Sequence, residues 1–311
     1  MRNAQMSFNI IVILGPTASG KTGLAAAVAS RIGGEIISAD SRQVFRGMDI
    51  GSGKDLSAYE INGQRIRTHL IDIMDAGAEY SVFRFQNDFS RAVTEIRERG
   101  NFPLLCGGTG LYIESVLESY ALQEVPRNEI LRETLSGKSM QELLALFSTL
   151  RTPHSTTDTL DRDRLLRAIE IETWQRENCS KTERSELRPL IIGILMPREV
   201  LRERIRMRLE QRLTEGLVEE VKSLISSGVP TDRLMAYGLE YRFITRYLQG
   251  ELDFDTMTDE LTTAIRQFAK RQMTWFRRME RKGHSIRWIN GLESPEEQLG
   301  RVLQMFSGEN G

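Results

Sequence analysis

Residues 15–22 have the sequence Gly-Pro-Thr-Ala-Ser-Gly-Lys-Thr, which fits the pattern Gly-x4-Gly-Lys-Thr. The pattern lies directly after an apolar run, Asn9 to Leu14, and directly before an alanine-rich stretch with helical character, Thr22 to Arg31. A strand that leads through a glycine turn into a helix directs several backbone N–H groups and the positive end of the helix dipole to one point, and Lys21 adds a full charge there. The motif therefore predicts a loop that binds a polyphosphate, without identifying which one.

The composition is typical of a globular protein. Of 311 residues, 40% are hydrophobic and 27% are charged, and this length fits one large domain with an insertion, or two domains. No run of ~20 apolar residues occurs, and the N-terminal segment lacks the apolar stretch of a secretory signal. We therefore expect a cytoplasmic protein that does not contact a membrane. The scattered cysteines and histidines argue against a disulfide framework and against a zinc site; they are Cys106, Cys179, His69, His154 and His284.

Short apolar runs alternate with helical patterns along much of the chain. They lie at Ile10–Leu14, Glu35–Ser38, His69–Ile73, Pro103–Cys106 and Leu190–Leu195. Such alternation is typical of a parallel sheet with helices on both faces. We therefore predict an α/β fold with a parallel sheet like that of the P-loop NTPases, flanked by helices.

The strand pattern is interrupted in the middle of the sequence. Between residues 117 and 187, polar helical segments such as Met140–Leu150 and Arg162–Arg176 replace the strands. We interpret residues 117–187 as a helical insertion domain between two parts of a catalytic core, residues 1–116 and 188–311. From Pro197 to Lys282 the pattern is almost wholly helical, with breaks at residues 228–230 and at Gly250.

Two further loops are expected near the P-loop. Asp40 directly follows the strand pattern that ends at Ala39, and the turn Gly107-Gly108-Thr109-Gly110 follows Cys106. We expect the strand before Asp40 to lie beside the P-loop strand, so that three loops meet at the carboxyl edge of the sheet. In a P-loop ATPase, Asp40 would hold Mg²⁺ through water. In a transferase it would be a general base, and as a structural residue it would cap a turn.

Positive charge is concentrated near the C-terminus, although the formal net charge of the chain is −1. Between residues 264 and 288 there are eight Lys and Arg residues and one acid, Glu280. Such a concentration attracts a phosphate backbone, and an alternative is that these residues pair with the acids of Glu251 to Glu260. We interpret the interleaved Phe268, Trp275 and Phe276 as core residues rather than as platforms for base stacking. The eight basic residues are Arg266, Lys270, Arg271, Arg277, Arg278, Arg281, Lys282 and Arg287.

A second basic stripe lies upstream. Arg204, Arg208 and Arg212 recur every four residues and so share one face of a helix. They either face solvent, with Glu203 and Glu210 close enough to pair with them, or contact a phosphate.

Several sequence blocks, in this order, resemble the tRNA dimethylallyltransferase (isopentenyltransferase) family. They are residues 15–22; residues 37–51, Ile-Ser-Ala-Asp-Ser-Arg-Gln-Val-Phe-Arg-Gly-Met-Asp-Ile-Gly; residues 69–73, His-Leu-Ile-Asp-Ile; residues 107–112, Gly-Gly-Thr-Gly-Leu-Tyr; residues 164–170, Arg-Leu-Leu-Arg-Ala-Ile-Glu; and residues 266–277, Arg-Gln-Phe-Ala-Lys-Arg-Gln-Met-Thr-Trp-Phe-Arg. Since no Cys/His zinc-finger segment follows Trp288, we expect the bacterial form. Residues 52–55 and 237–240 depart from the usual family pattern. We expect these departures to affect the contacts with tRNA and not the reaction.

The resemblance implies a reaction and roles for matching residues. The family transfers a dimethylallyl group from its diphosphate to the exocyclic amine of the adenosine 3′ to the tRNA anticodon. By resemblance Asp40, Thr109 and Arg212 are catalytic: Asp40 contacts the attacking amine, and the other two hold the diphosphate. The loop Gly15, Pro16, Thr17, Ala18, Ser19, Gly20, Lys21 and Thr22 binds the diphosphate, and the Thr22 hydroxyl is the expected ligand of a Mg²⁺ cofactor.

The resemblance also implies tRNA contacts and a monomeric enzyme. The expected tRNA-binding residues are Asp40, Ser41, Arg42, Gln43, Asp163, Arg164, Arg167, Arg266, Gln267, Lys270 and Arg271. The target base has to leave the anticodon loop to reach the site.

Two other functional classes fit parts of the sequence. A P-loop nucleoside or nucleotide kinase would also have a nucleotide-binding loop of the ATP-binding type, bound Mg²⁺ and a helical insertion. Its reaction would not explain the basic segment. A non-catalytic RNA-binding protein would bind tRNA without forming a product. A GTPase fits less well than a kinase, because no Asn-Lys-x-Asp motif occurs to recognise guanine.

Overall fold

The computed structural model describes residues 8–118, 125–150, 161–177 and 187–308. The chain forms two compact units, one of residues 1–119 with 186–311 and the other of residues 120–185. His154 and Cys179 lie outside the described residues. Among the helices that the structure describes, none combines the length and the apolar character that a bilayer crossing needs. That the larger unit carries the catalytic site and the smaller unit contacts tRNA stays a prediction.

The larger unit is built on a parallel sheet, which has six strands in the described part of the chain. Its order is β10 (Ile286–Asn290), β9 (Pro189–Leu195), β1 (Ile10–Leu14), β8 (Phe102–Gly107), β2 (Gly34–Ala39) and β6 (Thr68–His69). All five side chains of β1 are buried, as expected for a central strand. The α/β prediction is therefore confirmed.

Three details of the sheet differ from the predictions. The strand before Asp40 does not lie beside the P-loop strand, because β8 occupies the position between β1 and β2. The strand expected at His69–Ile73 ends at His69, because Leu70 and Asp72 adopt φ angles of 60° and 54° that turn the chain away from the sheet. Strand β10 was not predicted, and it adds a parallel edge next to β9.

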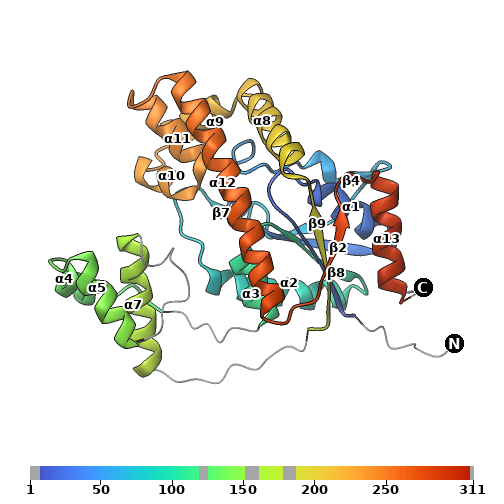
Figure 1. Ribbon diagram of the computed structural model, residues 1–311, viewed down its shortest axis with the longest axis horizontal. Coiled ribbons are helices and arrows are strands. Elements are labelled where there is room, and N and C mark those ends of the chain that lie inside the picture. The colour runs from blue at the N-terminus through green and yellow to red at the C-terminus, as the bar shows by residue number, and fades with distance from the viewer. Residues whose placement is uncertain (1–7, 119–124, 151–160, 178–186, 309–311) are drawn as a thin grey trace. The chain divides into compact units, whose positions relative to one another are not determined.

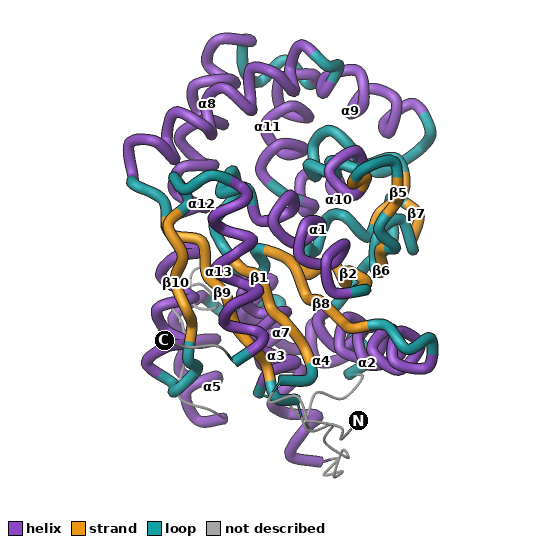
Figure 2. Tube along the Cα trace, turned by 90° about the vertical axis from the view of Figure 1, so that its right-hand side faces the viewer, coloured by secondary structure: helices purple, strands orange, loops and turns teal. Residues whose placement is uncertain are grey.

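Helices cover both faces of this sheet (Figures 1 and 2). Alternate residues of β1 enter two hydrophobic clusters, since Ile10 and Val12 belong to one and Ile11 and Ile13 to the other. The first cluster is covered by α2 (Val82–Glu98), α3 (Gly110–Leu117) and the end of a long helix, α12 (Phe254–Arg281). The second is covered by α1 (Lys21–Ile32) and α13 (Pro295–Ser307).

A third hydrophobic cluster lies among helices near one end of the sheet, where Figure 1 draws α8, α9 and α11. It is formed by α8 (Arg198–Thr214), α9 (Leu217–Ser226), α10 (Thr231–Tyr237), α11 (Leu239–Leu248) and the first half of α12. Because Leu261 of α12 enters this cluster while Phe276 enters the sheet cluster, α12 joins the two cores. The predicted helix breaks at residues 228–230 and at Gly250 are confirmed.

The aromatic residues of α12 only partly follow the core interpretation. Phe276 is fully buried, and Trp275 packs against the sheet cluster. Phe268 instead lies between two guanidinium groups, with its ring centroid 5.8 Å from Arg42 Cζ and 5.9 Å from Arg271 Cζ. It belongs to none of the hydrophobic clusters in the described residues.

Short strands connect the main elements of the larger unit. Strand β3 (Phe45–Arg46) pairs in parallel with β7 (Met74–Asp75), and β4 (Glu60–Ile61) pairs with β5 (Gln64–Arg65) in an antiparallel hairpin that follows a 3₁₀ turn at Ser57–Tyr59.

The smaller unit consists of helices in its described part. It contains α4 (Glu129–Leu135), α5 (Met140–Leu150) and α7 (Arg162–Glu177), which pack around a core that includes Leu143, Phe147 and Ile169. Glu170 is buried beneath this core and accepts hydrogen bonds from Arg132 (2.6 Å) and Arg167 (3.0 Å).

Candidate active site

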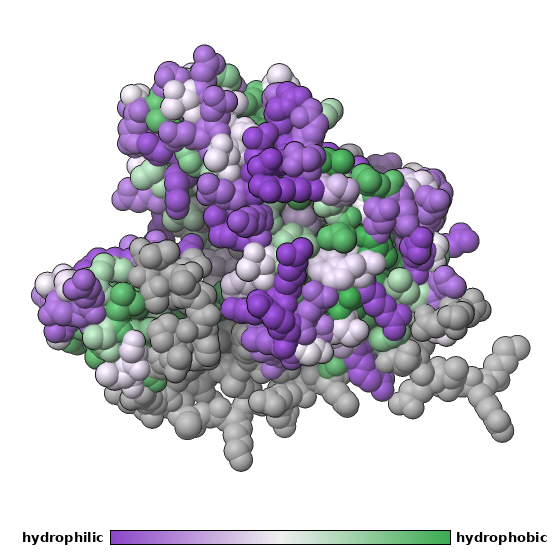
Figure 3. Space-filling view, in the orientation of Figure 1, coloured by the Kyte–Doolittle hydropathy of each residue, from purple (hydrophilic) through white to green (hydrophobic). Residues whose placement is uncertain are grey.

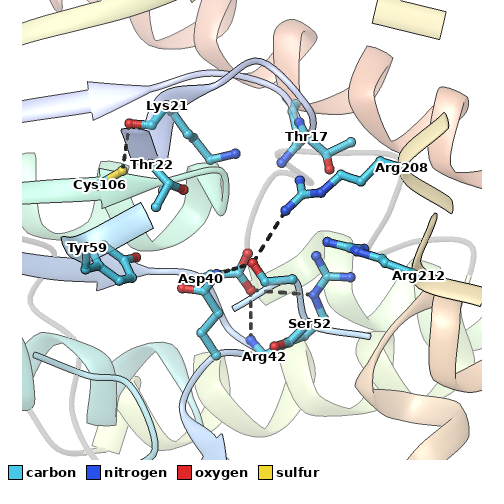
Figure 4. Close-up of a pocket in the computed structure, with 14 residues that line it drawn as sticks. Thr17, Lys21, Thr22, Asp40, Arg42, Ser52, Tyr59, Cys106, Arg208 and Arg212 are labelled. Carbon is cyan, nitrogen blue, oxygen red and sulfur yellow. Dashed lines mark hydrogen bonds and ion pairs between the residues drawn. The ribbon is translucent and has the colours of Figure 1, made fainter. Parts of the chain in front are cut away.

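The P-loop faces a polar pocket at the carboxyl edge of the sheet (Figure 4). Thr17, Lys21 and Thr22 line it together with Asp40 from the loop after β2 and with Gly107, which is the last residue of β8 and the first of the glycine turn 107–110. Three loops therefore meet here, as predicted, because parallel strands present their carboxyl ends at one edge whatever their order in the sheet. The remaining lining residues are Arg42, Gln43, Ser52, Gly53, Tyr59, Cys106, Arg208, Arg212 and Gln272.

The P-loop folds into a tight turn before α1. Gly20 occupies the N-cap position with a φ of 87°, where a side chain is disfavoured, and helix α1 begins at Lys21. Gly15, Pro16, Ala18 and Ser19 belong to the same turn, but they and Gly20 are not among the described lining residues of the pocket. The buried Ser19 hydroxyl has no hydrogen-bond partner among the described residues.

Lys21 supplies a half-buried cation to this turn. Its Nζ donates to the Pro16 carbonyl oxygen at 3.3 Å. Burial lowers the pKa of Lys21, and the Asp40 carboxylate acts in the opposite direction. An anion bound in the pocket would stabilise the charged ammonium.

Asp40 lies in the pocket and also caps a turn. Its Oδ1 accepts hydrogen bonds from the Arg42 backbone N–H at 3.0 Å and from Arg42 Nε at 3.5 Å. The turn-capping interpretation and the active-site interpretation are therefore compatible, since both contacts use one oxygen of the carboxylate.

Thr109 does not line the pocket in the described part of the chain. It is the N-cap residue of α3, and its Oγ1 accepts a hydrogen bond from the Ser41 N–H at 3.3 Å. Its own N–H donates to the Ala39 carbonyl oxygen at 3.2 Å. Thr109 thus ties the loop after β8 to the loop that carries Asp40, and its role at a diphosphate stays a prediction.

Two arginines of α8 reach the pocket. Arg212 was predicted, and Arg208, one turn earlier, was considered only as part of a stripe. Arg204 is exposed and is not among the described lining residues. Glu203 and Glu210 do not pair with this stripe; both pair with Arg206, at 2.5 and 2.6 Å. Figure 4 shows the Arg208 and Arg212 side chains directed toward the space beside Asp40.

The pocket holds more positive than negative charge. Lys21, Arg42, Arg208 and Arg212 line it, and Asp40 is the one carboxylate among the described lining residues. Glu240, which is buried, accepts from Arg42 Nη1 at 2.8 Å and from Arg212 Nη1 at 3.4 Å.

Desolvation destabilises the charged forms of Arg208 and Arg212. Burial lowers the pKa of Arg208 to about 10, with a further contribution from neighbouring Arg212. Burial also lowers the pKa of Arg212, although Glu240 acts in the opposite direction. A polyanion in the pocket would restore favourable pairing for both guanidinium groups.

Gly53 allows the two arginines to approach the loop after β3. Its carbonyl oxygen accepts from Arg208 Nη2 at 3.5 Å and from Gln43 Nε2 at 3.4 Å. Its φ is 69°, and a Cβ added there would overlap the Arg212 guanidinium group. No sequence signal placed Ser52 or Gly53 at the site, because their position depends on the packing of this loop against α8 and α9.

Cys106 and Tyr59 line the pocket without a nucleophilic role. Burial raises the pKa of the Cys106 thiol to about 12, so the thiol stays protonated at neutral pH. Burial likewise raises the pKa of Tyr59.

The residues expected beside the target base lie next to Asp40. Gln43 accepts a hydrogen bond from the Ser38 hydroxyl at 2.8 Å, and Ser41 donates to Thr109. Arg42 is held by Glu240 below the pocket. Their contacts with tRNA stay predictions.

The basic segment on α12 divides into two sets. Gln267, Lys270, Arg271, Arg277 and Arg281 are exposed, while Arg266 is half-buried. Arg278 and Lys282 instead pair with the buried Glu114. Figure 3 shows hydrophilic surface over parts of α8 and α12. The alternative pairing with Glu251 and Glu260 is wrong, because both of these acids pair with Arg246, at 2.9 and 3.6 Å.

The candidate tRNA contacts of the smaller unit have different surroundings. Arg164 is exposed, and Asp163 lies 3.6 Å from Arg132. Arg167 donates to the Val125 carbonyl oxygen at 2.6 Å in addition to Glu170, so its guanidinium group already supports the local fold.

The oxygen donors of the pocket suit Mg²⁺, which needs few protein ligands, better than a metal ion whose ligands all come from protein side chains. Within the described ranges, no three His, Cys, Asp or Glu side chains are grouped to hold a metal ion. Thr22 offers one hydroxyl and Asp40 one carboxylate at the same pocket. Mg²⁺ typically takes few protein ligands and completes its shell with phosphate oxygens and water.

Comparison with known proteins gives consistent matches over nearly the whole chain. The IPP transferase family model matches residues 43–279. The chain is 50% identical over 299 residues to tRNA dimethylallyltransferase 1 of Porphyromonas gingivalis, covering 96% of this chain and 99% of that protein. It is 51% identical over 298 residues to tRNA dimethylallyltransferase 2 of Bacteroides fragilis, covering 96% and 97%.

Solved structures agree with these matches. The full-length tRNA isopentenylpyrophosphate transferase of Bacillus halodurans superimposes with a TM-score of 0.72 at 31% identity, covering 97% of this chain and 96% of that one. A eukaryotic dimethylallyltransferase acting on tRNA shares the fold, with a TM-score of 0.75 at 20% identity and coverage of 96% and 79%.

Proposed function

This chain belongs to the tRNA dimethylallyltransferase family, a family of tRNA-modifying prenyl transferases, and on that premise we propose how its pocket performs the transfer. The donor is dimethylallyl diphosphate, and the acceptor is the exocyclic amine of the adenosine 3′ to the tRNA anticodon. The family match supports prenyl transfer to tRNA and not the kinase alternative.

The observation that carries the proposal is the group of cations around the P-loop. Lys21, Arg208 and Arg212 line one pocket with the P-loop turn, and Asp40 lies beside them. A diphosphate gains negative charge as it leaves, so cations positioned before the reaction stabilise the transition state more than the ground state.

The proposed reaction needs no covalent enzyme intermediate. The amine lone pair of adenosine attacks the allylic carbon of the donor, and the bond between that carbon and the diphosphate oxygen breaks. The diphosphate leaves with the bonding electron pair, and Asp40 accepts the proton that the amine loses. Because Arg42 holds Oδ1 of Asp40, the carboxylate has a fixed orientation toward the acceptor.

Thr22 is the proposed protein ligand of Mg²⁺, and Asp40, which lines the same pocket, would interact with the ion through water. When bound, the ion would neutralise charge on the diphosphate oxygens.

The exposed basic residues of α12 are the proposed grip on the tRNA backbone, with Arg164 as a second contact from the smaller unit. The adenine leaves the single-stranded anticodon loop, where unstacking costs least, and enters beside Asp40. A monomeric state and a cytoplasmic location stay predictions.

The test is single-turnover prenylation of an anticodon stem-loop by Asp40→Asn. We expect the chemical rate to fall by roughly 10²–10⁴, because the variant keeps the shape but cannot take the proton. Binding of donor and RNA should stay within a few-fold. Asp232→Asn on α10, where the carboxylate is exposed, is the matched control. An unchanged single-turnover rate in Asp40→Asn would remove this residue from the mechanism.

A further inference from the structure

One side chain of α12 bridges the two glycine-containing loops of the pocket. Gln272, which is 7% exposed, accepts a hydrogen bond from the Thr17 N–H through Oε1 at 2.8 Å. Its Nε2 donates to the Gly108 carbonyl oxygen at 2.9 Å. The bonds join residues 255 and 164 positions apart in the sequence, so one amide ties the P-loop to the loop after β8.

The chemistry of this bridge requires an amide side chain. The P-loop offers a backbone donor and the other loop a backbone acceptor, and a primary amide carries both complementary functions on one planar group. A Cβ at position 108 would overlap Gln272 Nε2, so the absence of a side chain there leaves room for the contact. The bond to the Gly108 carbonyl oxygen is buried and the bond from the Thr17 N–H is part-buried, and an apolar residue at position 272 would leave both backbone groups without this partner at a cost.

The bridge also determines where Lys21 points. The peptide group between Pro16 and Thr17 is trans, so its N–H and its carbonyl oxygen face opposite directions. Gln272 holds the N–H on one side, while the Pro16 oxygen accepts from Lys21 Nζ at 3.3 Å on the other. If this peptide rotated, it would present an N–H to the ammonium group instead of an oxygen. Fixing the Thr17 N–H therefore fixes the oxygen that orients Lys21.

We propose that Gln272 is a positioning residue for diphosphate binding, which acts by fixing the Pro16–Thr17 peptide and, through it, the ammonium group of Lys21. The proposal rests on the proposed function, since it assigns the P-loop to the diphosphate of the donor. It needs no contact between Gln272 and the reacting atoms.

The first test measures binding of inorganic pyrophosphate to Gln272→Met, which keeps the volume and loses both hydrogen bonds. We expect the affinity to fall about 10- to 100-fold, the effect of leaving buried hydrogen-bonding groups unpaired. KM for dimethylallyl diphosphate should rise by a similar factor, with kcat reduced less and RNA affinity unchanged. Gln304→Met changes an exposed glutamine of α13 in the same way and should leave all of these values as in the unmodified protein.

The second test uses Gln272→Glu as a variant whose hydrogen bonding depends on pH. A protonated glutamic acid accepts from the Thr17 N–H and donates to the Gly108 oxygen, as glutamine does, while the ionised form has no donor. Burial against a carbonyl oxygen favours protonation, whereas the cations of the same pocket, Lys21, Arg42, Arg208 and Arg212, favour the ionised form. The ratio of pyrophosphate affinities, variant to unmodified protein, should therefore recover as the introduced carboxyl gains its proton, between about pH 7 and about pH 4.

Two results would overturn the proposal. One is tight pyrophosphate binding by folded Gln272→Met, and the other is an affinity ratio for Gln272→Glu that does not change with pH. Both measurements omit tRNA and prenyl transfer. If the unmodified protein bound pyrophosphate but did not prenylate RNA, the proposed function would fail while Gln272 would still be tested.

Discussion

One acid lies near each end of strand β2, and the two have different surroundings. Glu35, near the start of the strand, is 2% exposed and accepts hydrogen bonds from Arg99 (2.8 and 2.9 Å), from Asn101 (2.7 Å) and from His69 if its Nε2 is protonated (2.6 Å). Asp40, just after the end of the strand, uses one oxygen for its contacts with Arg42. Glu35 is thus a structural residue, whereas Asp40 keeps an oxygen for the pocket.

Glu35 makes stability depend on pH. Burial alone would raise its pKa, but the hydrogen bonds from Arg99, Asn101 and His69 outweigh burial and lower the pKa from 4.5 to about 2. The stabilisation is therefore complete above the unfolded-state pKa of 4.5 and is lost as the pH falls toward 2. A shift of this size corresponds to about 3 kcal/mol. Urea unfolding at several pH values should show this extra loss in the unmodified protein and not in Glu35→Gln, and parallel curves would contradict it.

The sequence was informative about residues that belong to local motifs. Asp40 directly follows a strand, and Lys21 and Thr22 follow one through the P-loop, so the motif and the fold class place them at one edge of the sheet. Arg208, Gly53 and Gln272 come from distant elements, and their arrival in the pocket depends on tertiary packing. A helical repeat drew attention to Arg208 together with the exposed Arg204, and only the structure separates the two.

At the scale of elements, helix α12 combines two kinds of basic residue. Arg278 and Lys282 pair with Glu114, which is fully buried in α3, and the Arg278 guanidinium lies 4.1 Å from the Trp275 ring centroid. Lys270, Arg277 and Arg281 are exposed and form no ion pair within the described ranges. Charge counting along the sequence cannot separate the sets, because the partner acid lies on another helix.

This division predicts opposite results for two groups of variants. Lys270→Gln, Arg277→Gln and Arg281→Gln should each flatten the dependence of log tRNA affinity on log salt concentration by about one phosphate contact or less. Arg278→Gln should instead lower the melting temperature, because it leaves Glu114 with less compensation for its burial. Titrations at several salt concentrations with thermal unfolding separate these effects. An unchanged slope in all three exposed variants would refute the proposed grip on tRNA.

Element prediction succeeded where apolar runs are long and buried. Strands β1, β2, β8 and β9 were found because their side chains are buried on both faces of the sheet. The order of the strands was not predictable in this way, since the connection from β1 through α1 to β2 passes over a position that β8 fills later in the sequence. Backbone turns at Leu70 and Asp72 shortened β6, and no glycine marked them.

For the whole molecule, the sequence predicted a helical segment between core strands, and α4, α5 and α7 form a small core of their own. For the segment that forms the third hydrophobic cluster, around α8 to α11, the sequence predicted helices but not their packing into a common core. Its tertiary role, which is to bring Arg208 and Arg212 over the P-loop, follows from packing between elements that are far apart in the sequence.

Helix α12 presents cations to solvent and Gln272 to the P-loop within the same turns. Two ligands that favour the same position of one helix are thermodynamically linked, and the linkage is reciprocal. Anticodon stem-loop RNA should therefore raise the affinity for pyrophosphate, and pyrophosphate should raise the affinity for RNA by the same factor, about 5-fold or more. Calorimetric titrations in both orders measure this factor, which should approach one in Gln272→Met. Independent binding in the unmodified protein would mean that α12 carries both contacts without communicating between them, whereas a shared factor would make each substrate an effector of the other.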